Sequence, residues 1–109
     1  MITRSWTFLV VAGIFEVVWA IGLKYSQGFT SVGATALTLA ALIASFYLLA
    51  RSLETIPVGT AYAVWTGIGA VGTAVLGIML FGEPRHLARL ACILIVVIGI
   101  IGLKVTAAR

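Results

Sequence analysis

Charged residues interrupt this chain so rarely that long uncharged stretches occupy almost all of it. Residues 25–50, 55–82 and 90–103 contain no Asp, Glu, Lys or Arg, and residues 6–23 contain only Glu16. Of the 109 residues, 62% are hydrophobic and 9% are charged, whereas soluble domains are roughly 25% charged. Because a helix needs about 20 apolar residues to cross the hydrocarbon core of a bilayer, the pattern predicts an all-α integral membrane protein with four transmembrane helices.

We expect these helices at residues 6–24, 33–51, 58–81 and 87–104, in a single transmembrane domain over residues 1–109. The connections between them are short, which leaves no room for a soluble domain. The fourth uncharged run has about 14 residues, or roughly 21 Å of helix, and this is less than the thickness of the hydrocarbon core. This helix must therefore extend Arg89 and Lys104 to the membrane surface or lie in a protein interface.

The basic residues lie mostly at the ends of the predicted spans. Four of them fall on one side of the membrane and three on the other: Arg4, Arg51, Lys104 and Arg109 against Lys24, Arg85 and Arg89. Because the two sides carry nearly equal numbers of basic residues, the positive-inside rule favours neither orientation. This balance predicts dual topology, with copies inserted in both orientations. The formal net charge of +4 is scattered, so we do not expect nucleic acid as a partner.

Four short helices can hardly enclose a pathway, because each needs most of its surface for packing or lipid. We therefore expect a homodimer. An even number of spans cannot supply an inverted repeat within one chain, whereas an antiparallel homodimer can. Small residues in the fourth span, Gly99 and Gly102 among them, suit helix–helix contact and predict that this span packs in the dimer.

Glu16 is the only acidic residue inside a predicted span. An ionisable group at that depth costs roughly 2.5–3.5 kcal/mol on insertion scales, so a functional site is the default interpretation. Removal from water favours the protonated carboxyl, and a second copy of Glu16 nearby would favour it further. A cation that binds the carboxylate must displace the proton, which would couple the two. The alternative is an intramembrane ion pair with Lys24, which lies about 12 Å along the helix and could pair only across two chains.

Several residues are candidates for a pocket around this carboxylate. Gly13 and Trp19 lie three residues before and after Glu16, so they share its helix face. Gly13 would leave space and Trp19 would add an aromatic wall or an indole N–H. Trp19 could instead anchor the helix at the lipid interface.

The second and third spans carry further polar and aromatic candidates. Tyr62 and Trp65 share one helix face and could line the same cavity, or serve only in packing. Ser45 could orient the carboxylate or the substrate, or could bond to its own helix backbone. Gly67 and Gly69 predict a hinge in the third span, although close helix packing would also explain them.

The sequence contains few of the residue types that carry out catalysis in enzymes. It has one His, one Cys and no Asp, and no metal-binding set, nucleophile triad or phosphate loop. We therefore expect a secondary active transporter rather than an enzyme, with no cofactor and with the proton gradient as its driving force.

The chain resembles the small multidrug resistance family over essentially its whole length, and six segments carry the resemblance. They are GIFEVVWA (13–20), LKYS (23–26), GFT (28–30), SFYLL (45–49), IPVGTAYAVWTGIG (56–69) and FGEP (81–84). The resemblance implies an antiparallel homodimer in a bacterial inner membrane that exchanges protons for cations at Glu16.

Within that family the chain is more similar to the guanidinium exporters than to the exporters of polyaromatic drugs. Trp19 is the discriminating residue, because the drug exporters typically carry small or hydroxyl residues there. Glu83-Pro84 also resembles the guanidinium branch. The resemblance implies a pocket made by Glu16, Trp19, Ser45, Tyr62 and Trp65. Two alternatives stay open: export of quaternary ammonium drugs past the Ala-rich second span (Ala36, Ala40, Ala41 and Ala44), and a passive channel or non-transporting subunit.

Overall fold

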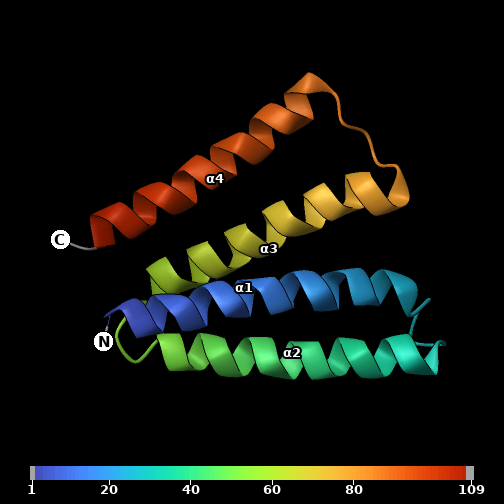
Figure 1. Ribbon diagram of the computed structural model, residues 1–109, viewed down its shortest axis with the longest axis horizontal. Coiled ribbons are helices and arrows are strands. Elements are labelled where there is room, and N and C mark those ends of the chain that lie inside the picture. Colours follow the sequence, from blue (N-terminus) through green and yellow to red (C-terminus); the bar gives the residue numbers. More distant parts are fainter. Residues whose placement is uncertain (1, 108–109) are drawn as a thin grey trace.

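The computed structural model describes residues 2–107, and the described chain consists of four α-helices joined by short connections (Figure 1). The helices are α1 (Ile2–Tyr25), α2 (Val32–Ser52), α3 (Val58–Phe81) and α4 (Leu87–Ala107). All four are long and apolar enough to cross a membrane. The prediction of an all-α chain with four membrane spans is confirmed.

The helix ends differ from the predicted ends mainly at the two terminal helices. We placed the start of the first helix at residue 6, but α1 begins at Ile2 and continues through Arg4. Likewise, α4 runs past Lys104 to Ala107. A charge marks where a helix leaves the hydrocarbon, but Lys and Arg are good helix formers and do not end the helix itself. The 21 residues of α4 are therefore enough for a span.

Both of the connections at one end of the molecule use left-handed backbone. In the α1–α2 connection, Gln27, Gly28 and Phe29 have φ angles of 52°, 71° and 70°. Ser26 holds this turn, since its hydroxyl donates to the Leu23 carbonyl at 2.7 Å and accepts from the Phe29 N–H at 3.2 Å. At the end of α3, Gly82 adopts φ 65°, which glycine reaches without steric cost.

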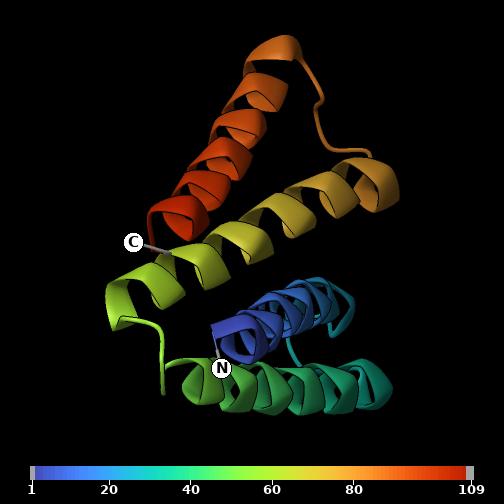
Figure 2. The same cartoon turned by 60° about the vertical axis from the view of Figure 1, so that its left-hand side comes forward.

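α1 is the central helix of the described chain. It packs against α2 along its length, and α3 crosses its other side (Figures 1 and 2). The buried core lies where these three helices meet, and it includes Trp6, Leu9, Val64 and Trp65. The core therefore brings α1, α2 and α3 together along the first half of α1.

α4 is the least buried of the four helices, and its contacts with this core come from Ile100 and Leu103. Its backbone approaches that of α3 alone among the helices, and none of the residues in its membrane span is buried. Figure 2 shows α3 and α4 diverging toward the connection that joins them. At the other end, Lys104 Nζ lies 5.2 Å from the centre of the Trp6 ring, which ties the end of α4 to the start of α1.

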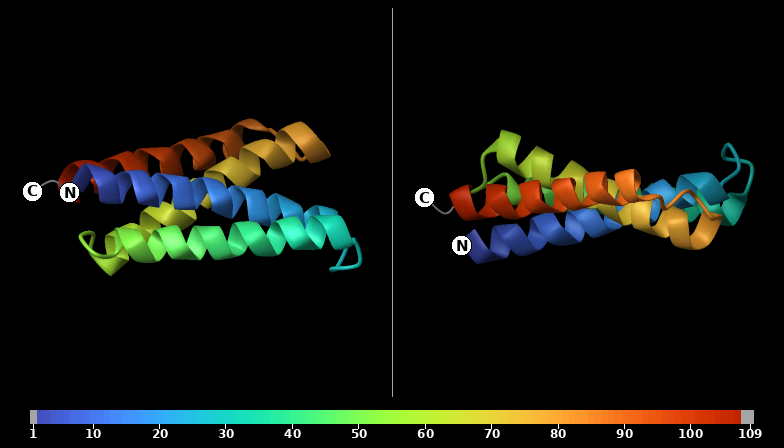
Figure 3. Two further views of the ribbon diagram at one scale, coloured as in Figure 1. Left: turned by 60° about the horizontal axis from the view of Figure 1, so that its bottom comes forward. Right: turned by 90° about the horizontal axis from the view of Figure 1, so that it is seen from above.

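The helices form a layer rather than a closed bundle (Figure 3). The principal extents of the molecule are 45, 35 and 17 Å. The start of α1 and the end of α4 lie on the same side as the α2–α3 connection, and the other two connections lie opposite (Figure 1), as expected for a chain that crosses a membrane four times. A layer this thin does not surround a central path.

Candidate functional site

Glu16 lies at the interface between α1 and α3, and its carboxyl group fits against Gly69. A Cβ atom at position 69 would overlap the carboxyl group of Glu16. Glu16 is partly buried, and its Oε1 atom is buried without a hydrogen-bond partner among residues 2–107. The structure therefore holds an acceptor inside a membrane span that is unpaired within the chain.

Two buried hydrogen bonds link α1, α2 and α3 at the turn of α1 that precedes Glu16. The fully buried Ser45 hydroxyl on α2 donates to the Ala12 carbonyl of α1 at 2.7 Å. The same oxygen accepts the indole N–H of Trp65 on α3 at 2.9 Å. In an α-helix the carbonyl of residue 12 is also the acceptor for the backbone N–H of residue 16. The Ser45–Trp65 pair is thus attached to the helical turn that carries Glu16.

Two further aromatic rings surround Trp65. The ring of Phe46 lies 5.4 Å away at an interplanar angle of 44°, and the ring of Tyr62 lies 5.5 Å away at 54°. Tilted aromatic pairs at this distance are favourable beyond the area they bury. Trp65 is 4% exposed, whereas Phe46 is 48% and Tyr62 is 56% exposed, so both outer rings remain open to a ligand or to a second copy.

Trp19 presents a second unpaired polar atom on the face of α1 that carries Glu16. Its side chain is partly buried, and its Nε1 atom has no hydrogen-bond partner among residues 2–107. Residues three apart are neighbours on a helix surface. A donor on Trp19 and an acceptor on Glu16 are therefore both free for a ligand that could use them.

The sequence comparison decides the family. The family model described as Small Multidrug Resistance protein matches residues 4–98. The chain belongs to the Small Multidrug Resistance family. With its four membrane-capable helices, this member is a multi-pass protein of the bacterial inner membrane.

Several curated relatives of this Small Multidrug Resistance chain carry the name Guanidinium exporter. The relative from Yersinia pseudotuberculosis serotype I (strain IP32953) is 57% identical over 100 residues, covering 92% of this chain and 96% of its own. The relative from Escherichia coli (strain K12) is 55% identical over 102 residues, covering 94% and 97%. A third, from Citrobacter freundii, is 56% identical over 102 residues with the same coverage.

The structure gives the glycines of the predicted site specific packing environments. A Cβ atom at Gly13 would lie 2.6 Å from Cγ2 of Ile68, so α3 fills the space that we expected beside this glycine. A Cβ atom at Gly67 would lie 2.9 Å from Cδ1 of Ile100 on α4. α3 is helical throughout at Gly67 and Gly69. Their role as a hinge stays a prediction.

Gly99 and Gly102, the glycines predicted to pack in a dimer, lie on the open part of α4. No atom of the described chain would lie within 4 Å of a Cβ atom at either position. The surface that they occupy is therefore available to another helix, and their part in a dimer stays a prediction.

Sequence reasoning missed two groups that contact the predicted site residues, the Phe46 ring and the Ala12 carbonyl. Phe46 packs on Trp65, and its place beside Ser45 was the only signal in the sequence. The Ala12 carbonyl is a main-chain group, so no side-chain pattern could reveal it. The structure joins Ser45, Trp65 and Tyr62 through direct contacts, and it places Glu16 and Gly69 together on the neighbouring face.

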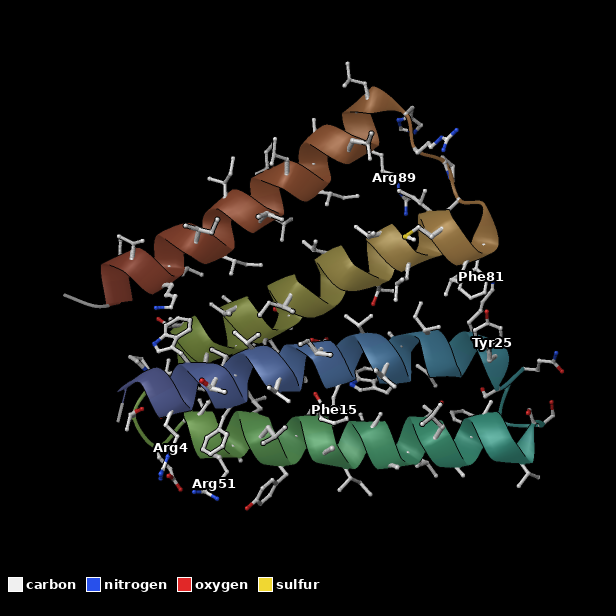
Figure 4. All side chains as sticks on the ribbon, viewed as in Figure 1. Arg4, Phe15, Tyr25, Arg51, Phe81 and Arg89 are labelled. Carbon is white, nitrogen blue, oxygen red and sulfur yellow. The ribbon has the colours of Figure 1, made fainter. Side chains whose placement is uncertain are left out.

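Aromatic and cationic side chains meet at both ends of the helical layer (Figure 4). At one end, Lys24 Nζ lies 5.4 Å from the centre of the Phe81 ring, and the Tyr25 ring lies 5.4 Å from the same ring. At the other end, the Arg51 guanidinium lies 5.3 Å from the Phe8 ring and 5.9 Å from the Tyr47 ring. These contacts fasten α1 to α3 at one end and to α2 at the other.

Proposed function

We propose that this protein exports guanidinium and small guanidinyl cations across the inner membrane in exchange for protons. The observation that carries the proposal is the carboxyl group of Glu16, which has an unpaired buried oxygen inside a span of a chain that is 55–57% identical to proteins named Guanidinium exporter. A transporter of this kind needs one group that can hold either ion, and Glu16 is the only acidic side chain within the four predicted spans.

Exchange follows from competition for a single negative charge. A protonated carboxyl is neutral and does not attract a cation, so guanidinium binds only after the proton has left. Release of guanidinium leaves a carboxylate in a poorly solvated site, which favours proton uptake. If the site opens to one side of the membrane at a time, each cation that leaves is replaced by protons that move the other way.

The chemistry of guanidinium suits a carboxylate with neighbouring aromatic rings. Guanidinium is planar, it presents N–H donors in a fixed fork, and it binds carboxylates in a bidentate manner. Its face also stacks on aromatic rings. The protein already places aromatic rings and a carboxylate around its own guanidinium at Arg51, which lies over Phe8 and Tyr47 and whose Nε is 3.4 Å from Oε2 of Glu54.

The hydrogen bonds of Ser45 would keep the site rigid. They fix Trp65 and the turn of α1 that carries Glu16 relative to each other. A small, rigid polar site discriminates by leaving the polar groups of the protein unpaired when the wrong ligand binds. In this proposal Ser45 and Trp65 position the site, and Trp19 and Tyr62 complete its wall.

The working unit in this proposal is an antiparallel homodimer of chains inserted in both orientations. One chain forms a thin layer, and its α4 has no buried residue in the span. A second copy would cover the open face of α4 that carries Gly99 and Gly102 and would bring a second Glu16 to the site. The near balance of basic residues on the two sides supports insertion in both directions.

Export of quaternary ammonium cations is the second candidate, and one feature of the structure favours it. An apolar cavity of about 390 Å³ lies between α1 and α2 beside Leu76 of α3, and Val17 and Leu37 are among its other lining residues. It begins at the residue that follows Glu16. An alkyl tail could enter this cavity while the cationic head stays at the carboxylate.

A transport assay separates the two candidates. Purified protein in proteoliposomes is given an inward proton gradient and one of three cations: guanidinium, a tetraalkylammonium ion or a polyaromatic cation. We expect guanidinium flux that requires Glu16, with loss of flux in Glu16→Gln and unchanged flux in the control Glu54→Gln, whose carboxylate lies outside the spans. Preference for the polyaromatic cation would favour the second candidate. Guanidinium flux that survives Glu16→Gln would refute the proposal.

A further inference from the structure

An apolar groove runs between α3 and α4 on the side of the chain away from Glu16. Its volume is about 230 Å³, and its lining includes Ala70, Ala74, Cys92, Ile93 and Val96. The groove lies where the two helices diverge toward their connection (Figure 2). Small side chains on α3 leave its floor open, and its walls are hydrocarbon.

Arg89 is the one charged residue that lines this groove. It lies in the first turn of α4, and Figure 4 shows its side chain directed into the space between α3 and α4. Its Nη2 atom donates to Oε1 of Glu83 at 2.9 Å. Its Nε atom is buried and has no hydrogen-bond partner among residues 2–107. A guanidinium carries five N–H donors, so one carboxylate oxygen leaves most of them unused.

Glu83 is itself held in place against α3. A Cβ atom at Gly77 would overlap its carboxyl group, and the backbone N–H of Glu83 donates to the Gly77 carbonyl at 3.3 Å. The ion pair therefore fixes the Arg89 guanidinium at the mouth of the groove. Arg85 adds a second positive charge on the same connection, so the cations there outnumber the single carboxylate.

These features select an anionic occupant with an apolar tail. We propose that the α3–α4 groove binds an anionic phospholipid, whose phosphate accepts from Arg89 and whose acyl chain lies along the groove. Arg89 is in the first turn of a membrane span, which is the depth of the lipid headgroups. Basic pockets between transmembrane helices are suited to such headgroups, and the free guanidinium donors match the phosphate oxygens.

A second copy of the chain fits this groove less well. The sequence has three acidic side chains: Glu54 is paired with Arg51, Glu83 is paired with Arg89, and Glu16 lies in the α1–α3 interface. Among residues 2–107, a second copy therefore has no unpaired carboxylate at its surface to give to Arg89. Free phosphate would satisfy the charge but would leave the apolar groove empty.

Native mass spectrometry of the full-length protein in detergent tests the proposal. The protein is offered an equimolar mixture of phosphatidylglycerol and phosphatidylcholine with identical acyl chains. We expect wild type to retain phosphatidylglycerol about tenfold more than phosphatidylcholine, because the choline ammonium neutralises the phosphate of phosphatidylcholine whereas phosphatidylglycerol keeps its net negative charge for Arg89. Arg89→Gln should lose this preference, and the control Arg85→Gln, which does not line the groove, should keep at least half of it.

A second variant keeps the charge and fills the groove. Ala70 is exposed and lines the groove, so Ala70→Leu should lower phosphatidylglycerol retention several-fold without disturbing the core. Cys92 is the only cysteine of the chain and also lines the groove. Phosphatidylglycerol should slow its alkylation by a maleimide in wild type but not in Arg89→Gln.

Four results would overturn the proposal. They are equal retention of the two lipids by wild type, a preference that survives Arg89→Gln, displacement of the lipid by millimolar inorganic phosphate, and an Ala70→Leu variant that keeps its lipid but no longer dimerises. The third result would assign the site to a free anion, and the fourth would assign the groove to a second copy. None of the four depends on whether the protein transports guanidinium.

Discussion

The buried Ser45 side chain on α2 makes hydrogen bonds with both of the other core helices. Its hydroxyl is both a donor to α1 and an acceptor from α3 while it sits on α2. Sequence reasoning left open whether this serine bonded to its own helix or contributed to the site. The structure decides for contact between helices, because packing brings the Ala12 carbonyl within 2.7 Å, and only the folded arrangement determines that distance.

Removing the Ser45 hydroxyl should therefore be costly. Ser45→Ala leaves the Trp65 indole N–H unpaired in the core, and an unsatisfied buried donor costs about 1–3 kcal/mol. We expect a lower free energy of unfolding by that amount and weaker guanidinium binding. Thermal unfolding in detergent and equilibrium binding measure the two effects.

Ser52 provides the matched control. It is equally buried on the same helix, but its hydroxyl donates only to the Leu49 carbonyl of its own helix at 2.7 Å. Ser52→Ala should be milder in stability and neutral in binding. Equal effects of the two substitutions would show that the link between helices has no special role.

The helices themselves were predictable because the distribution of charge reflects where the chain meets water. Their arrangement was not. The divergence of α4 from α3 and the placement of Arg89 in the resulting groove depend on the angle between two helices, and both helices are apolar around most of their circumference. The fit of Gly69 against Glu16 depends on the crossing of α1 and α3 in the same way. The sequence singled out Glu16 and Gly69 but could not show that they are in contact.

The α1–α3 crossing yields a prediction at the scale of these two helices. Gly69→Ala adds a methyl group that overlaps the carboxyl group of Glu16, so α1 and α3 must separate or the carboxyl group must turn away. We expect transport to fall at least tenfold although alanine stabilises a helix relative to glycine by about 1 kcal/mol. Gly59→Ala is the control on the same helix, since nothing lies within 4 Å of its added methyl. Full activity in Gly69→Ala would show that this close contact is dispensable.

For the whole molecule, the balance of basic residues predicts insertion in both orientations. Gln27→Lys with Phe29→Lys adds two positive charges to an exposed connection, and Leu53→Lys with Glu54→Lys adds two lysines and removes one negative charge on the opposite side. Each double variant should adopt one orientation, as tags at the two termini would report. Each alone should lose most transport, and the two expressed together should recover it.

The matched result for wild type is equal labelling of each terminus from both sides of the membrane. A single orientation in wild type, or full transport by either double variant alone, would contradict an antiparallel dimer. Transport by a fixed-orientation variant would require a parallel pair or a single chain.

The central claim is that a proton and a cation compete for Glu16, and proton release on binding tests it most directly. Guanidinium is added to purified protein in weakly buffered detergent solution, and the change in pH is recorded. The account predicts that wild type releases protons as guanidinium binds and that Glu16→Gln neither binds guanidinium nor releases protons. Guanidinium binding by wild type over a range of pH with no proton release at any value would contradict it.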